Sequence, residues 1–164
     1  MVELNGTELT IEQVIARHKE QVRISEPAKQ KIDRARAYVD EKLAQKAVIY
    51  GLTTGFGKFS DTFVPEQETA ALQRNLIISH ACGMGAPLPC EVVRGAMLLR
   101  CNALARGNSG IRLSTLETLL AMLNRGVHPV VPEKGSLGAS GDLAPLSHIV
   151  LVMLGEGEAE YQGA

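Results

Sequence analysis

Signals for the start and the end of helices recur along the sequence, and they constrain its fold more than any other feature. Thr10 and Gln13 form a capping-box pattern, which predicts a helix from there to about His18. Ser25 can cap a second helix that has Pro27 in its first turn, where the missing N–H of proline costs little. Apolar residues at helical spacing follow in this segment: Ile32, Ala35, Val39 and Leu43.

Further helices are predicted from signals of the same kind. Pro65 opens a helix that reaches His80, because glycines and prolines then prevent its continuation. Ser114 and Glu117 form a second capping box, and the helix that they start ends at Gly126. Two more helical segments are predicted at about residues 91–106 and 142–154. Short strands are expected only at the two ends of the chain, at residues 2–4 and 158–163. The chain is therefore predicted to be mainly α.

Composition excludes several classes of function. The 164 residues are 45% hydrophobic and 21% charged, which is typical of one compact globular domain. A net charge of −1 without a basic stripe argues against nucleic-acid partners and anionic membranes. The longest apolar stretch, residues 143–154, is short and interrupted, and the N-terminus lacks a signal-peptide pattern, so no membrane span is expected. Three cysteines without CxxC spacing predict free thiols, a cytoplasmic setting and no metal site.

The segment GSLGASGDLAPL, residues 135–146, carries the most specific chemistry of the sequence. Gly141 has no side chain, so its amide nitrogen can approach the carbonyl of Ala139 in a bend that other residues resist. Attack there would close a five-membered ring. Loss of one water from the ring, and of the Ser140 hydroxyl as a second water, would leave an electrophilic exocyclic methylidene. The helix that follows would place the positive end of its dipole beside this ring.

A bare Ala-Ser-Gly triplet is most simply a glycine-rich loop, and the residues around it change this interpretation. The sequence from Gly135 to His148 resembles the signature of the aromatic amino acid ammonia-lyase family. Residues 50–57, YGLTTGFG, look like the tyrosine loop of that family, and residues 75–83, NLIISHACG, are similar to its substrate-recognition segment. The resemblance implies the N-terminal domain of the ammonia-lyase/fumarase-like helical fold with minor short strands. It also implies that Ala139-Ser140-Gly141 matures autocatalytically into 4-methylideneimidazole-5-one (MIO), without a metal or nucleotide.

The resemblance assigns roles to individual side chains. Tyr50 would be the catalytic base, which a phenol can be only where donors or positive potential stabilise its anion; otherwise it is an aromatic at a loop edge. His80 and Ser79 would bind the substrate's side chain, unless His80 is simply satisfied at a helix C-terminus. Ser79-His80 resembles histidine-specific members. Thr53 stands where those members usually carry Asn, and Thr is familiar there from phenylalanine-type members.

The expected reaction is therefore the elimination of ammonia from L-histidine to give trans-urocanate. A phenylalanine or tyrosine ammonia-lyase, or an aminomutase of the same family, is the alternative. Because members of the family are much longer and form homotetramers, residues 1–164 are expected to be a single N-terminal domain of a longer lyase. This domain would lack the central helical bundle and C-terminal region and would be inactive alone, since the carboxylate clamp and other groups lie downstream in the family.

Two other classes of function remain open. A serine hydrolase could use Ser140 with Asp142 and either His80 or His148, although a nucleophile elbow requires Gly where Asp142 stands. A non-catalytic domain could pair its exposed apolar helices with partner chains. The remaining histidines have no partners at ligand spacing, and His128 and His148 are predicted to be structural: His18, His128 and His148.

Overall fold

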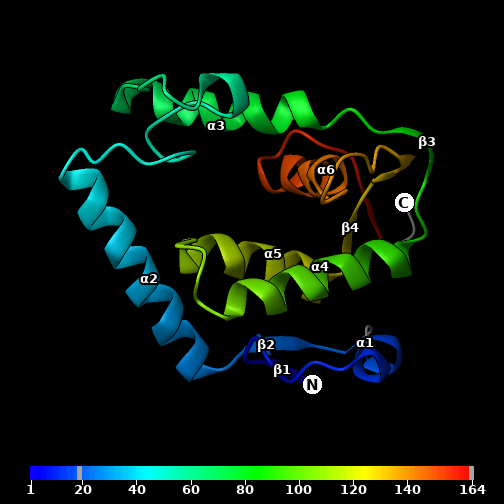
Figure 1. Ribbon diagram of the computed structural model, residues 1–164. Helices are drawn as coiled ribbons and strands as arrows, with labels where there is room; N and C mark the ends of the chain where they lie inside the picture. Colours follow the sequence, from blue (N-terminus) through cyan, green and yellow to red (C-terminus); the bar gives the residue numbers. More distant parts are fainter. Residues whose placement is uncertain (18–19, 163–164) are drawn as a thin grey trace.

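A computed structural model describes residues 1–17 and 20–162 as a mainly helical chain with three small two-stranded sheets (Figure 1). The helices are α1 (Ile11–Arg17), α2 (Glu26–Ala44), α3 (Glu66–His80), α4 (Cys90–Ala105), α5 (Leu113–Arg125) and α6 (Leu143–Met153), with a 3-10 turn at Gly57–Phe59. The strands are β1 (Val2–Leu4), β2 (Val22–Ile24), β3 (Met84–Pro87), β4 (Val127–Pro129), β5 (Pro132–Lys134) and β6 (Ala159–Tyr161). None of the described helices combines the length and apolar character that a membrane span requires.

Most of the predicted helix boundaries are confirmed. Thr10 and Gln13 form the capping box, because the Gln13 amide donates to Thr10 Oγ1 over 3.2 Å and the Thr10 amide donates to Gln13 Oε1 over 3.0 Å. Ser25 Oγ caps α2 by accepting from the amide of Ala28 over 3.4 Å. Gly126 ends α5 in the left-handed conformation, with φ at +72°. The predicted end of the first helix at His18 lies outside the described residues.

Two expectations about local structure were wrong. Helix α5 begins at Leu113 with Arg112 at its N-cap, so Ser114 lies inside the first turn and forms no capping box with Glu117. Strands also occur inside the chain rather than only at its ends. Strand β3 pairs antiparallel with β5, β4 pairs antiparallel with β6, and β1 pairs in parallel with β2. These pairings join segments that are distant in the sequence, so the local pattern of residues did not reveal them.

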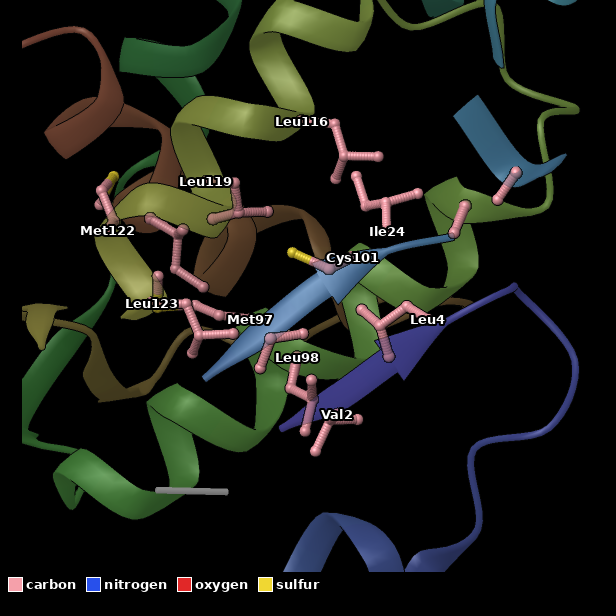
Figure 2. Packing of buried hydrophobic residues seen from close by; sticks show 14 of the residues in the cluster. Val2, Leu4, Ile24, Met97, Leu98, Cys101, Leu116, Leu119, Met122 and Leu123 are labelled. Carbon is pink, nitrogen blue, oxygen red and sulfur yellow. The ribbon is translucent and has the colours of Figure 1, made fainter. Parts of the chain in front are cut away.

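The hydrophobic core lies where α4 and α5 pack on the β1–β2 pair (Figure 2). Val2 pairs with Val22 and Leu4 with Ile24, and the alternation of the strands turns these four side chains to the same buried face. The helices contribute side chains that are fully buried: Met97, Leu98, Cys101, Leu116 and Leu123. Each buried aliphatic side chain contributes about 1.5–3 kcal/mol, so this core fixes the platform that carries α6.

Helix α6 lies between α3 on one side and the α4–α5 pair on the other (Figure 1). Ile149 of α6 is buried in the core, and α3 contacts the same helix. Helix α2 leads away from the β1–β2 pair to the loop that precedes α3, residues 47–64. The fold therefore brings this loop, α3 and the start of α6 together, although they are far apart in the sequence.

Candidate active site

Three segments that are distant in the sequence line one open pocket of about 790 Å³. The loop at residues 47–64 contributes one wall, the second half of α3 another, and the start of α6 a third. The lining residues are Tyr50, Gly55, Phe56, Gly57, Phe59, Thr62 and Val64 from the loop, Leu72, Leu76, Ile77 and His80 from α3, and Leu143 and Ser147 from α6. The structure thus brings two of the predicted site residues, Tyr50 and His80, into one pocket beside the helix that follows the Ala-Ser-Gly triplet.

Tyr50 projects from the tip of the loop, and its side chain is exposed. Its hydroxyl oxygen accepts a hydrogen bond from the amide of Gly57 over 3.3 Å. Its ring meets the ring of Phe56 edge-on, with 5.8 Å between the centroids and 73° between the planes. The phenol oxygen is therefore oriented by a main-chain donor that the turn at Gly57 supplies.

Two buried threonines hold this loop in shape. Thr53 Oγ1 accepts from the amide of Ile49 over 2.9 Å and donates to the carbonyl of Ala47 over 2.8 Å. Thr54 Oγ1 accepts from the amide of Gly51 over 3.2 Å. Both hydroxyls therefore satisfy the loop's own backbone, and the described pocket lining does not include either of them. Thr53, the departure from the histidine-type pattern, thus supports the loop instead of facing the pocket.

His80 is the last residue of α3, and contacts of its Nδ1 with Leu76 and Ser79 of the same helix orient its ring. Nδ1 lies 2.8 Å from the carbonyl oxygen of Leu76 and 3.1 Å from Ser79 Oγ. Because a carbonyl oxygen only accepts, the proton of the neutral ring belongs on Nδ1, which leaves Nε2 as the acceptor. Ser79 Oγ donates to the same carbonyl over 2.8 Å, so this hydroxyl supports the His80 ring and is not among the described lining residues.

The triplet Ala139-Ser140-Gly141 forms a turn immediately before α6, and Ala139 and Ser140 are exposed. Gly141 has φ at +74°, and a Cβ built on it would lie 2.7 Å from Ser136 Oγ, so only glycine fits there without strain. The triplet itself is not among the described lining residues of the pocket, which begin on α6 with Leu143.

Asp142 joins the triplet to the rest of the fold. A hydrogen bond from the Ser140 hydroxyl, helped by Arg100, holds the pKa of Asp142 below its usual range. The guanidinium of Arg100 on α4 lies 2.9 Å from the carboxylate. Asp142 stands at the N-cap of α6, but its side chain makes these two contacts and no capping bond. The turn that carries Ser140 is thereby tied to α4.

His128 and His148 are not among the described lining residues of the pocket. The ring of His148 accepts the amide of Gly83 at Nε2 over 3.0 Å, which is the structural role predicted for it. His128 belongs to β4 and is paired across the ladder with Glu160. Within the described part of the chain, the hydrogen bonds of His80 and His148 join them to Leu76, Ser79 and Gly83, whereas the serine hydrolase alternative requires a histidine bonded to Ser140. Among those same residues, no group of three side chains could hold a metal ion.

Sequence reasoning missed the residues that support the site. Thr54 and the amide of Gly57 depend on how the loop folds back on itself, and the contact between His148 and Gly83 depends on how α6 packs against the segment after α3. A threonine pair between glycines was the only signal available for the loop, because Thr side chains often bond to nearby main-chain groups.

The chain resembles known proteins in both sequence and structure. The model of the aromatic amino acid lyase family matches residues 9–164. The histidine ammonia-lyase of Alkaliphilus oremlandii is 61% identical over 162 residues, which are 98% of this chain and 32% of that protein. The crystal structure of histidine ammonia-lyase from Trypanosoma cruzi has a TM-score of 0.88 and 40% identity, over 98% of this chain and 31% of its own.

A second similar structure is that of an enzyme named for a different activity. The phenylalanine aminomutase of Pantoea agglomerans has a TM-score of 0.94 and 33% identity, over 100% of this chain and 32% of its own. The chain therefore spans about a third of the length of the relatives that it matches. Because the family model covers nearly all of the sequence and the fold agrees throughout, this chain belongs to the aromatic amino acid lyase family.

Proposed function

We propose that residues 1–164 are the N-terminal domain of a histidine ammonia-lyase, which eliminates ammonia from L-histidine to give trans-urocanate. One observation carries this proposal: Tyr50 and His80 line the same pocket as the start of α6, the helix that directly follows the Ala139-Ser140-Gly141 triplet. Relatives that are 58–61% identical to this chain are named histidine ammonia-lyase.

The triplet has the properties that cyclisation into MIO requires. Gly141 has φ at +74°, in the left-handed region that residues with a side chain rarely adopt, so its nitrogen belongs to the one residue type that tolerates such a bend. The Ser140 hydroxyl, which must leave, lies close enough to the carboxylate of Asp142 to lower the pKa of that group. We propose that Ala139, Ser140 and Gly141 form the MIO group, which would supply an electrophile for the substrate's amine. The proposal requires no metal or nucleotide.

Tyr50 is proposed as the base that removes the proton next to the substrate's ring. The amide of Gly57 donates to its oxygen over 3.3 Å and so orients the oxygen that would accept the proton. The hydroxyls of Thr53 and Thr54 hold the loop that presents this oxygen. The base is thereby oriented before substrate arrives, which is the arrangement that efficient proton transfer needs.

His80 and Ser79 are proposed to select the substrate's side chain. With its proton on Nδ1, the His80 ring offers Nε2 as an acceptor for the N–H of a substrate imidazole. Ser79 orients that ring through Nδ1. A phenylalanine side chain would leave the acceptor without a partner, which costs about 1–3 kcal/mol where the site excludes water. The alternative of a phenylalanine-type enzyme rests on Thr53, whose hydroxyl is occupied by the loop's backbone.

The whole enzyme is proposed to be longer and to act as a cytoplasmic homotetramer. Large apolar side chains remain exposed around the pocket and on the outer helices: Phe59, Phe63, Ile78, Leu99 and Leu143. Apolar surface of this extent marks a place where further protein packs. On this proposal residues 1–164 alone lack the groups that hold the substrate's carboxylate, and they are inactive or nearly so.

Two measurements on the full-length polypeptide that contains residues 1–164 test the function. Its intact mass should be lower than the sequence mass by two waters, and peptide mapping should place the loss at Ala139–Gly141. The same protein should convert L-histidine to urocanate and ammonia. Formation of a β-amino acid in place of urocanate would identify an aminomutase. A full mass together with no turnover of histidine would refute the proposal.

A further inference from the structure

Helix α3 ends abruptly at the proposed selector residue. Ala81 follows His80 with φ −79° and ψ 62°, and the amide of Cys82 donates to the carbonyl of His80 over 2.9 Å. This is the geometry of an inverse γ-turn, which ends the helix within one residue. The next main-chain donor is the amide of Gly83. It donates to Nε2 of His148 on α6 over 3.0 Å.

Gly83 is enclosed at this contact. A Cβ built on Gly83 would lie 3.0 Å from His148 Nε2 and 3.1 Å from Cβ of Pro132 on β5. From the other side, a Cβ built on Gly135 would lie 3.1 Å from Cα of Gly83 and 3.3 Å from Cβ of Ala144 on α6. The segment after α3 is therefore packed between β5 and α6, and the hydrogen bond to His148 fixes its position there.

His148 belongs to α6, whose start forms the third wall of the pocket, but His148 is not part of the described pocket lining. Its neighbour Ser147 lines the pocket, and the triplet precedes the same helix. The ring of His148 is half-buried, and accepting a main-chain amide requires the neutral form with Nε2 unprotonated. Burial also lowers the pKa of His148, which favours that neutral form.

We propose that His148 is a positioning residue of this active site: by accepting the Gly83 amide it locks the end of α3, and with it His80, to the helix that follows the triplet. The inference rests on the proposed function, because the role of His80 does. Release of this contact would let the selector ring move relative to the ring-forming triplet, which leaves the reacting groups in place but weakens the binding of the substrate's side chain by His80.

Substitution of His148 in the full-length enzyme tests this role. His148→Leu keeps a similar volume without an acceptor, and it should raise KM for L-histidine about tenfold, the effect of one lost hydrogen bond, with kcat changed about twofold at most. His148→Gln restores an acceptor at the reach of Nε2 and should return KM to the wild-type value. Hydrogen exchange at the Gly83 amide should be faster in His148→Leu and slow in both His148→Gln and the wild type.

A second variant changes Gly83, the residue that donates to His148 in this contact. Gly83→Ala places a methyl group 3.0 Å from Nε2 and should raise KM in the same way. Because both changes remove one interaction, the double variant should be no worse than the more affected single variant. Additive effects, an unchanged KM in His148→Leu, or slow Gly83 exchange in that variant would overturn the inference. Absence of histidine turnover in the wild type would refute the proposed function, whereas the exchange measurement tests the His148 contact by itself.

Discussion

Main-chain groups determine what the two central side chains of the pocket can do. The amide of Gly57 donates to the Tyr50 oxygen, and the carbonyl of Leu76 fixes the proton of His80 on Nδ1. The sequence predicted Tyr50 and His80 through their resemblance to family segments. It did not predict these contacts, because they depend on the conformation of a loop and on the last turn of a helix. The sequence therefore predicted which residues lie in the site, but it did not predict the tautomer of His80 or the orientation of either side chain.

His80 provides the sharpest test of substrate choice. His80→Leu removes the acceptor that is proposed for the substrate imidazole and should reduce kcat/KM for L-histidine by about tenfold or more in the full-length enzyme. The loss for L-phenylalanine should be much smaller, because that side chain offers no donor. His128→Gln, on β4 outside the pocket lining, is the matched control and should leave both values unchanged. Equal losses for both substrates in His80→Leu would argue against the selector role.

Ser140 should control the titration of its neighbour Asp142. The Ser140 hydroxyl and then Arg100 stabilise the carboxylate, so the folded pKa of Asp142 lies below its unfolded value. This contribution to stability is fully present above the unfolded pKa, about 3.9, and is lost as pH falls through the lower folded value. In unmodified chains, Ser140→Ala should move the carboxyl pKa of Asp142 upward, as measured by NMR titration of its side-chain carbon. An unchanged titration would show that Arg100 alone sets it.

At the scale of elements, the sequence predicted several helix caps and helix ends correctly, but it did not predict which strands pair. Thr10, Ser25 and Gly126 act locally, within one turn of the helix that they bound, so their sequence context suffices. Strands β3 and β5 are short, and they pair only because α3 and α6 bring their segments together. The capping box at Ser114 failed for a related reason: the helix extends one residue before it, to Leu113, where a local pattern cannot set the boundary.

The end of α5 offers a prediction about stability. Gly126→Ala forces a side chain into the left-handed region and should lower the free energy of unfolding by about 1 kcal/mol. The cost is confined to the backbone, because the nearest atom to the new Cβ is 3.9 Å away, in His128. Gly95→Ala is the control inside α4, where a Cβ meets only Val14 at 4.0 Å, and it should stabilise by about 0.5–1 kcal/mol. Urea denaturation measures the free energy of unfolding of both variants. A loss of stability in both would contradict the assignment of the Gly126 effect to its left-handed backbone.

At the scale of the whole molecule, the core is closed off from solvent within this chain, whereas the candidate site is open to solvent. The core around α4, α5 and the β1–β2 pair forms within the described residues, with buried side chains from each element. The pocket is open, and large apolar side chains beside it stay exposed. This contrast explains why the fold can be understood from this chain, whereas the proposed activity requires the rest of a longer enzyme that supplies further walls.

The exposed apolar surface should make the isolated 164-residue chain associate. Leu99 on α4 is 53% exposed and Ile78 on α3 is 42% exposed, and association is the way for such side chains to leave water when other partners are missing. Light scattering should therefore give a mass above that of the monomer.

Leu99→Lys and Ile78→Lys should each shift the chain toward monomer while its melting temperature changes by about 4 °C at most, because neither side chain contributes to the core. The chemically similar but fully buried Leu98 is the control, since Leu98→Lys should unfold the protein. A wild-type chain that stays monomeric at high concentration would mean that these side chains are tolerated in water, and the proposed packing of further helices against them would lose its support.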